Sequence, residues 1–236
     1  MKKKQITDIN IKSDSITLTG IAVMMLLTLS KVVPASTIAG YSVLVGIAFF
    51  FITEAVSKTR GDESGLRFHT IAADLKKPGV SLWLLLPVVS GIVTLVVGNL
   101  IFGEDFAAHV MGRTGSMLSF DKTALLTGQV IIAAFGEEIA FRGFFFGKSS
   151  KLFPAWVCAV VSSAVFAAGH IAAGNTGIVI YDISTIFIDS LIFSVIYHKS
   201  GNCIISTFSH ILANAVSLAV TFVFFKIFPW VQKCRN

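Results

Sequence analysis

The sequence predicts an all-α fold: a polytopic membrane protein with about seven transmembrane helices, and between six and eight, in one bundle. The first observation is composition, since 54% of the residues are hydrophobic and only 14% are charged, whereas a soluble domain carries about 25% charged residues. The second is continuity, because the apolar residues form runs of about 20 residues, the length that a helix needs to cross a bilayer. Together they exclude a soluble globular protein.

Seven apolar runs predict the individual spans, at residues 15–33, 37–56, 80–102, 122–147, 153–173, 177–198 and 203–228. The polar segment 57–79 predicts a cytoplasmic loop with a short interfacial helix over 66–77. The segment 102–117 predicts a loop on the opposite side of the membrane.

The predicted organisation has three parts: an amino-terminal part with three spans (1–120), a second part (121–228) with the polar motifs, and a short tail (229–236). Most of the 19 Lys and Arg residues lie at the amino end and in alternate loops, which predicts a cytoplasmic amino terminus. These residues explain the net charge of +6 without a nucleic-acid partner. We expect an integral protein of a bacterial cytoplasmic membrane, whose partners are the lipid bilayer and a substrate; the sequence leaves the oligomeric state open.

Two adjacent glutamates, Glu137 and Glu138, lie in the otherwise apolar stretch AFGEEIAFRG. Ionisable residues within spans are costly and mark functional sites by default. Glu138 and Arg142 are four residues apart, with the acid nearer the amino end, which is the favourable order for an ion pair on a helix. Glu137 is rotated by about 100° from that pair. We therefore expect Arg142 to neutralise Glu138 and leave Glu137 free to act.

Two further polar pairs follow in later spans. Phe166 and His170, in FAAGH, are one helical turn apart, and so are His210 and Asn214, in HILAN. An Asn beside a His suits either stabilisation of an oxyanion or orientation of the imidazole. Together with Glu137 these residues supply what hydrolysis by a water nucleophile needs.

The remaining polar residues predict supporting roles. Asp182 and Asp189 lie two turns apart in the sixth span, and we expect hydrogen bonds between helices or support for His170 or His210. The spacing of the cysteines supports neither a disulfide framework nor a thiolate zinc site, so a packing role is expected for Cys158, Cys203 and Cys234. Three other histidines are expected to be solvated: His69, His109 and His198.

The three motifs, EEIAFR (Glu137, Glu138, Arg142), FAAGH and HILAN, resemble the ordered motifs EExxxR, FxxxH and HxxxN of the CPBP family, which comprises CAAX proteases and bacteriocin-processing enzymes and is also called Abi. The resemblance covers roughly residues 120–225, so residues 121–228 are expected to be a CPBP-like catalytic core. It implies an intramembrane endopeptidase. The chain has neither the GxSG motif of a rhomboid-type serine protease nor the GxGD motif of a presenilin-type aspartyl protease.

By resemblance, Glu137 is the general base and His170 its partner on the same water, while His210 and Asn214 hold the oxyanion. Phe166 supports the site, and Arg142 pairs with Glu138 and orients the helix or binds a substrate carboxylate. No cofactor is required by this reading. Zinc is the alternative, because Glu137, His170 and His210 match a ligand set of two histidines and one glutamate with an open position.

A function of a different class is left open: a non-catalytic bacteriocin-immunity protein, or a proton-coupled transporter, would also place carboxylates and histidines in a helical bundle. The chain shows no internal repeat of the kind that transporters contain. The family name suggests prenylated substrates, but we expect a small secreted or membrane-inserted peptide or a membrane protein. The sequence does not identify the substrate.

Overall fold

The all-α class is confirmed. The computed structural model describes residues 2–32, 40–59, 63–115 and 123–227, and these contain no strand. Its helices are α1 (Lys2–Leu29), the 3-10 helix η1 (Ser30–Val32), α2 (Tyr41–Ser57), α3 (Ile71–Leu75), α4 (Val80–Phe102), α5 (Glu104–Gly115), α6 (Thr123–Glu137), the π-helix η3 (Glu138–Phe146), α7 (Gly147–Ser149), α8 (Ala155–Ala168), α9 (Thr176–Ser200) and α10 (Cys203–Ile227).

Each predicted apolar run contains a helix. In the part of the chain that the structure describes, four stretches are long and apolar enough to cross a membrane: Ile11–Leu29, Val80–Phe102, Thr176–Ser200 and Cys203–Thr221. Helices α2 and α8 are apolar but shorter. These helices support an integral membrane protein. The number of seven spans stays a prediction, as does the division at residue 120; the predicted tail, 229–236, lies outside the described residues.

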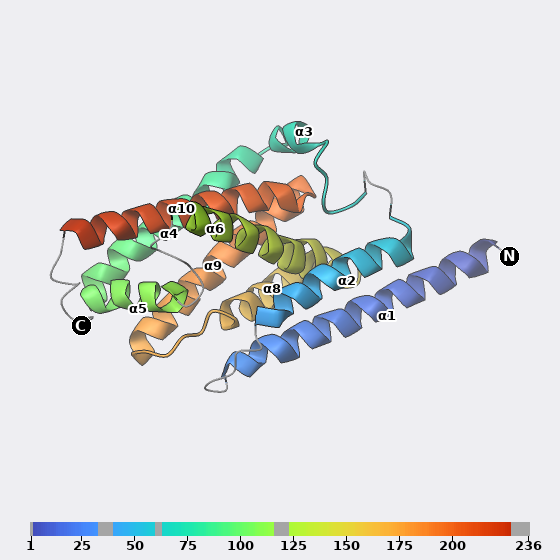
Figure 1. Ribbon diagram of the computed structural model, residues 1–236. Helices are drawn as coiled ribbons and strands as arrows, with labels where there is room; N and C mark the ends of the chain where they lie inside the picture. Colours follow the sequence, from blue (N-terminus) through green and yellow to red (C-terminus); the bar gives the residue numbers. More distant parts are fainter. Residues whose placement is uncertain (1, 33–39, 60–62, 116–122, 228–236) are drawn as a thin grey trace.

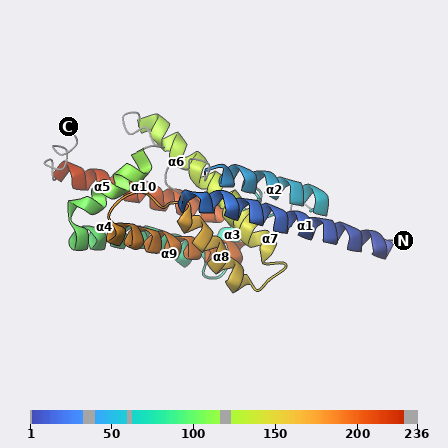
Figure 2. The same cartoon turned by 90° about the horizontal axis from the view of Figure 1, so that it is seen from below.

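The helices form two groups around a central one (Figures 1 and 2). Helices α1 and α2 lie side by side and antiparallel at one edge, and α4, α9 and α10 pack together on the other side. The π-helix η3 lies between the groups and contacts α2, α8, α9 and α10. This central element begins at Glu138, so the fold places the first motif in the middle of the bundle.

All nine residues of η3 are buried. Its phenylalanines pack with Phe50 of α2 and Phe166 of α8 in the largest apolar cluster that the structure describes. Helix α2 approaches closely because it has a glycine at the contact: a Cβ on Gly46 would lie 2.6 Å from the Cβ of Ala140. The sequence predicted one regular helix over 122–147, and the structure widens its second half into a π-helix, a feature frequent at functional sites.

The predicted loop 102–117 is wrong for most of its length, because residues 104–115 form helix α5. The reason is an apolar face in this otherwise polar segment. Phe106, which is fully buried, packs against Leu95 of α4 and Ile178 of α9, and its ring meets that of Tyr181 edge to face. Burial of this face stabilises a helix that the polar composition does not suggest.

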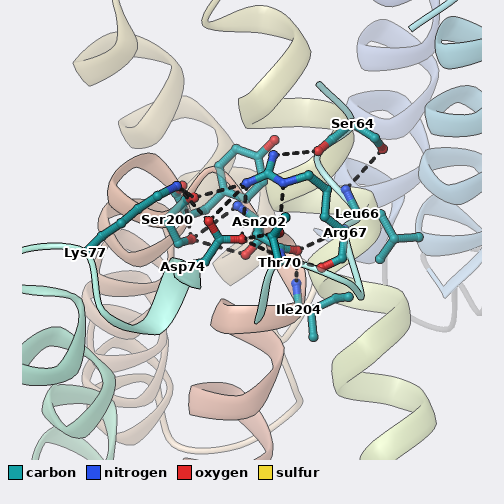
Figure 3. A network of polar contacts seen from close by, with 10 residues as sticks. Ser64, Leu66, Arg67, Thr70, Asp74, Lys77, Ser200, Asn202 and Ile204 are labelled. Carbon is teal, nitrogen blue, oxygen red and sulfur yellow. Dashed lines mark hydrogen bonds and ion pairs between the residues drawn. The ribbon is translucent and has the colours of Figure 1, made fainter. Parts of the chain in front are cut away.

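The segment 57–79 is mostly irregular where it is described, with α3 shorter than the helix expected over 66–77. A polar network ties it to the junction between α9 and α10 (Figure 3). Asn202, at that junction, donates to the Arg67 carbonyl at 2.7 Å and to Asp74 at 2.9 Å, and its own Oδ1 accepts from the Arg67 backbone N–H at 3.2 Å. The network therefore fixes where α10, which carries the third motif, begins.

Candidate active site

Glu138 and Arg142 form the ion pair that their spacing predicts. Arg142 Nη1 lies 3.0 Å from Glu138 Oε1, and both side chains are fully buried. The guanidinium also donates from Nη2 to the hydroxyl of Ser190 at 2.7 Å and to its carbonyl at 3.1 Å. Arg142 is fully buried, and its guanidinium is already bound to Glu138 and Ser190. This favours a role in orienting the helix over the alternative role of binding a substrate carboxylate.

Aromatic rings supply the rest of the environment of Arg142. Its guanidinium carbon lies 4.6 Å from the ring centroid of Phe166 and 5.2 Å from that of Phe193. A cation between two ring faces is stabilised by their quadrupoles in a place that water does not reach. Phe166 was expected to support the site; Phe193 and Ser190 carry no motif and could not be found from the sequence.

His210 lies between the two glutamates. Its Nδ1 is 3.0 Å from Glu138 Oε1, and its Nε2 is 3.7 Å from Glu137 Oε2. The imidazole also stacks on Phe193, with ring centroids 4.6 Å apart. Because a carboxylate only accepts hydrogen bonds, Glu138 fixes Nδ1 as a donor and so sets the orientation of the ring. No residue near His210 in the sequence predicted this partner.

The two adjacent glutamates have different surroundings. The Glu138 side chain is fully buried and bound to Arg142 and His210, whereas 19% of the Glu137 side chain is exposed. Glu137 is the last residue of α6, directly before the π-helix. One carboxylate therefore holds the site together, and the other is open to a small molecule such as water.

His170 lies just beyond the end of α8, not within a helix. The predicted fifth span extended to residue 173, but α8 ends at Ala168 and the chain turns through Gly169. His170 Nδ1 lies 2.9 Å from the Phe166 carbonyl oxygen, and the His170 ring is 4.7 Å from the Phe166 ring.

Phe166 connects the three motifs. Its ring contacts Arg142 on η3, His170 after α8 and His210 on α10, the last with ring centroids 6.2 Å apart. Asn214 lies one turn after His210 on α10, and its side chain is partly buried. The structure thus brings one residue of each motif, Arg142, His170 and His210, to one aromatic ring.

The alternative zinc set, Glu137, His170 and His210, is not grouped in this arrangement. Among the residues that the structure describes, no three His, Cys, Asp or Glu side chains are grouped so that they could hold a metal ion. The two nitrogens of His210 both face glutamates, and Nδ1 of His170 is occupied by a carbonyl. The side chains as placed do not fit a catalytic zinc, which requires three protein ligands at about 2.0–2.2 Å.

Asp182 does not support His170 or His210 directly. It is paired with two residues of α5, His109 and Arg113, at 3.3 Å and 2.9 Å. The expectation that His109 is solvated is therefore wrong, and its side chain is only 6% exposed, because α5 packs on the bundle instead of looping away from it. His69 and His198 are exposed, as predicted.

The other secondary predictions have simpler outcomes. Asp189 lies near Ser90 of α4, which agrees with a position between helices. Cys158 and Cys203 are buried free thiols, as expected of packing residues. Cys234 lies outside the described residues.

Comparison with known proteins gives one family. Residues 119–216 match the family model described as type II CAAX prenyl endopeptidase Rce1-like. No curated protein and no solved structure matches the chain. The matched segment contains all three motifs and every residue that meets around Phe166. The match agrees with the resemblance of the three motifs: residues 119–216 are similar to the Rce1-like CAAX endopeptidases, a family of peptide hydrolases.

Proposed function

We propose that the protein is an intramembrane endopeptidase that hydrolyses a peptide bond of a membrane-associated or secreted peptide, with Glu137 as the general base. The observation that carries this proposal is the difference between the adjacent glutamates. Glu138 is fully buried and bound to Arg142 and His210, whereas Glu137 is partly exposed and faces His210 Nε2 at 3.7 Å. A base must reach water and substrate, which favours Glu137.

The proposed reaction begins with a water molecule between Glu137 and His170. Glu137 accepts a proton as the water oxygen attacks the peptide carbonyl carbon, which forms a tetrahedral oxyanion. The proton then passes to the peptide nitrogen, the carbon–nitrogen bond breaks, and the products are a carboxylate and an amine. Removal of a general base typically costs about 10²–10⁴-fold in rate.

Glu138 acts through His210 in this mechanism. It accepts a hydrogen bond from Nδ1–H, so Nε2 is the nitrogen that faces the reacting groups, and Nε2 must also carry a proton when His210 holds the oxyanion. The resemblance assigns the oxyanion to His210 and Asn214, and the partly exposed Glu137 lies on the Nε2 side of that imidazole. The buried pair of Glu138 and Arg142 then serves as a rigid support for the catalytic histidine.

The proposal is tested with purified protein and a membrane-inserted peptide, by comparing the unsubstituted chain with Glu137→Gln. Gln keeps the shape and the hydrogen-bonding capacity of Glu but cannot accept the proton. We expect cleavage to fall by at least about 10²-fold while the unfolding transition is unchanged. Glu63→Gln, which alters an exposed glutamate in the segment 57–79, is the matched control and should cleave at the normal rate.

Two outcomes would overturn parts of this proposal. Full cleavage by the Glu137 variant would end the mechanism and favour an immunity or transport function. Loss of cleavage when a chelator is added to the unsubstituted protein would support a zinc ion that recruits the histidines in another arrangement. Unchanged activity with the chelator is the result expected if Glu137 and His170 activate water alone.

A further inference from the structure

One face of helix α5 carries two polar residues and faces the bundle. Phe106, His109 and Arg113 are spaced by three and four residues, so they lie along one face of the helix. Phe106 anchors this face in the cluster formed with Leu95 and Ile178. In Figure 1, α5 lies beside the first turns of α9, at the end of α9 that follows the His170 segment. His109 and Arg113 therefore point where Phe106 does, into the protein.

Both polar residues meet the same carboxylate. Asp182, on α9, is only 2% exposed. Arg113 binds it with two nitrogens, Nε at 2.9 Å from Oδ2 and Nη2 at 3.4 Å from Oδ1, and His109 Nε2 lies 3.3 Å from Oδ2. A buried carboxylate that contacts two nitrogens of a guanidinium fixes the orientation of the guanidinium plane. Asp182 thus aims Arg113, whose side chain keeps 19% of its surface exposed.

Arg113 and His109 lie near the segment that carries His170. The segment that joins His170 to α9 lies against α5, since a Cβ on Gly174 would lie 2.9 Å from His109 Nδ1. The charge of Arg113 acts electrostatically on both Glu137 and His170. Arg142, the cation of the first motif, is fully buried and engaged with Glu138 and Ser190. Of the two arginines that act electrostatically on Glu137, Arg142 is fully buried and Arg113 keeps part of its surface exposed.

Hydrolysis creates a need for such a cation. The reaction proposed above leaves a new carboxylate on the acyl product, beside Glu137 and within an apolar bundle. We propose that Arg113 is an anion-binding residue of this site, which takes the carboxylate formed on the acyl product, and that Asp182 and His109 are the positioning residues that hold it there. This inference rests on the proposed function and names a second contact for its product.

The test measures binding without turnover, so that it is independent of cleavage. The probes are the apolar tripeptide N-acetyl-Leu-Ala-Leu with a free carboxylate and the same peptide with a carboxamide end. Affinities of the full chain in detergent micelles are measured by calorimetric titration. We expect the acid to bind about tenfold or more tightly than the amide, because a charge-assisted hydrogen bond is lost with the amide.

Three variants locate the effect. Arg113→Gln should reduce the ratio of acid to amide affinity to about one, and Arg113→Lys should keep part of it, because the charge stays but the two-nitrogen grip on Asp182 is lost. Asp182→Asn should lower the ratio as well, since the guanidinium is no longer held. Lys31→Gln, which removes a cation of the 3-10 helix η1, outside the Asp182 cluster, is the matched control and should leave the ratio unchanged.

The ratio compares two ligands on one protein sample, so a lower yield of a variant does not affect it. A ratio near one in the unsubstituted chain, an acid that does not bind at millimolar concentration, or a ratio that survives Arg113→Gln would each overturn the inference. The proposed function fails by a different result, namely undiminished cleavage by Glu137→Gln. The two failures are therefore distinguishable.

Discussion

Two buried carboxylate–arginine networks in this protein differ in how completely their polar atoms are bonded. In the first, Asp74 accepts hydrogen bonds from Thr70 at 2.7 Å and Asn202 at 2.9 Å and forms ion pairs with Lys77 at 2.7 Å and Arg67 at 3.2 Å. Both carboxylate oxygens have partners (Figure 3). This network joins the segment 57–79 to the start of α10.

In the second network, around Glu138, polar atoms are left over. Within the described residues, Glu138 Oε2 and Arg142 Nε are buried without a hydrogen-bond partner. The hydroxyl of Ser206 lies near Glu138 but donates to the Cys203 carbonyl at 3.0 Å. Phenylalanine rings surround Arg142 where the first network has hydrogen-bonding groups.

The difference distinguishes a structural network from a chemical one. A fully bonded network fixes one geometry and offers nothing to a ligand, whereas unsatisfied buried groups are rare and call for a functional explanation. We infer that Asp74 contributes to folding and Glu138 to both folding and reaction. Substitutions that separate stability from activity test this assignment.

The largest effect is expected at the fully buried pair. Glu138→Gln leaves the Arg142 charge without a counterion, and breaking a buried pair by removing one partner costs about 3–5 kcal/mol. Arg142→Gln should cost a similar amount. Measurements of unfolding in detergent for both variants and the double variant give the coupling between them, and we expect the double variant to lose less than the sum.

A strictly additive double variant would show that the two side chains do not support each other. Charge reversal at both positions is not expected to restore the site fully. Arg142 donates to the Ser190 carbonyl, and a carboxylate at position 142 cannot donate a hydrogen bond to it. The reversed pair would also face His210 with a cation.

A smaller effect is expected at the fully bonded network around Asp74. Asp74→Asn should lower the free energy of unfolding by about 1.5–3 kcal/mol, the range for hydrogen bonds to charged groups. The loss is limited because Arg67 keeps other acceptors, including the Ser64 carbonyl at 2.8 Å. The rate of peptide cleavage per folded molecule should be unchanged. A slower rate in correctly folded protein would contradict the division between the two networks.

The ring of Phe166 should contribute still less to the free energy of unfolding. Phe166→Leu removes the ring face over Arg142 and is expected to cost about 1–2 kcal/mol, the upper part of the range for a desolvated cation–π contact. Cleavage should also slow, because the same ring contacts both histidines. Phe208→Leu, at a 49% exposed position on α10, is the matched control and should stay within about 0.5 kcal/mol. Equal losses at the two positions would argue against a special role for Phe166.

The sequence was sufficient for the helical class and for the contact between Glu138 and Arg142, because long apolar runs and a spacing of four residues are local signals. The same holds for Phe166, which shares a motif with His170. The contact between Glu138 and His210 joins residues 72 positions apart, and no local pattern encodes it. Phe193 and Ser190 were missed for the same reason, since they carry no charge or motif and act only through their position on α9.

Helix α5 shows how composition can mislead. Its polar residues predicted a loop, but Phe106 and Ala107 bury one face, and His109 and Arg113 find a carboxylate inside the bundle. The decisive partner, Asp182, lies more than 60 residues further along the chain. Tertiary contacts outweighed the local composition here, as they do for many short amphipathic helices.

The smallest expected effect is the pH dependence that the fully bonded network around Asp74 adds to the free energy of unfolding. Burial by itself would raise the pKa of Asp74, but hydrogen bonds from Lys77, Thr70 and Asn202, together with the charge of Arg67, hold the pKa of this carboxyl well below its ordinary value. The carboxylate therefore contributes stability that is fully present above the pKa of an unfolded Asp, near 4, and is lost as the pH falls toward the lower folded value. From pH 5 to pH 4 the loss should be about 0.3 kcal/mol, since only part of the unfolded Asp binds a proton in this range. Unfolding measured at both pH values should show a steeper dependence in the unsubstituted protein than in Asp74→Asn, and equal slopes would mean that the network does not bind the carboxylate form preferentially.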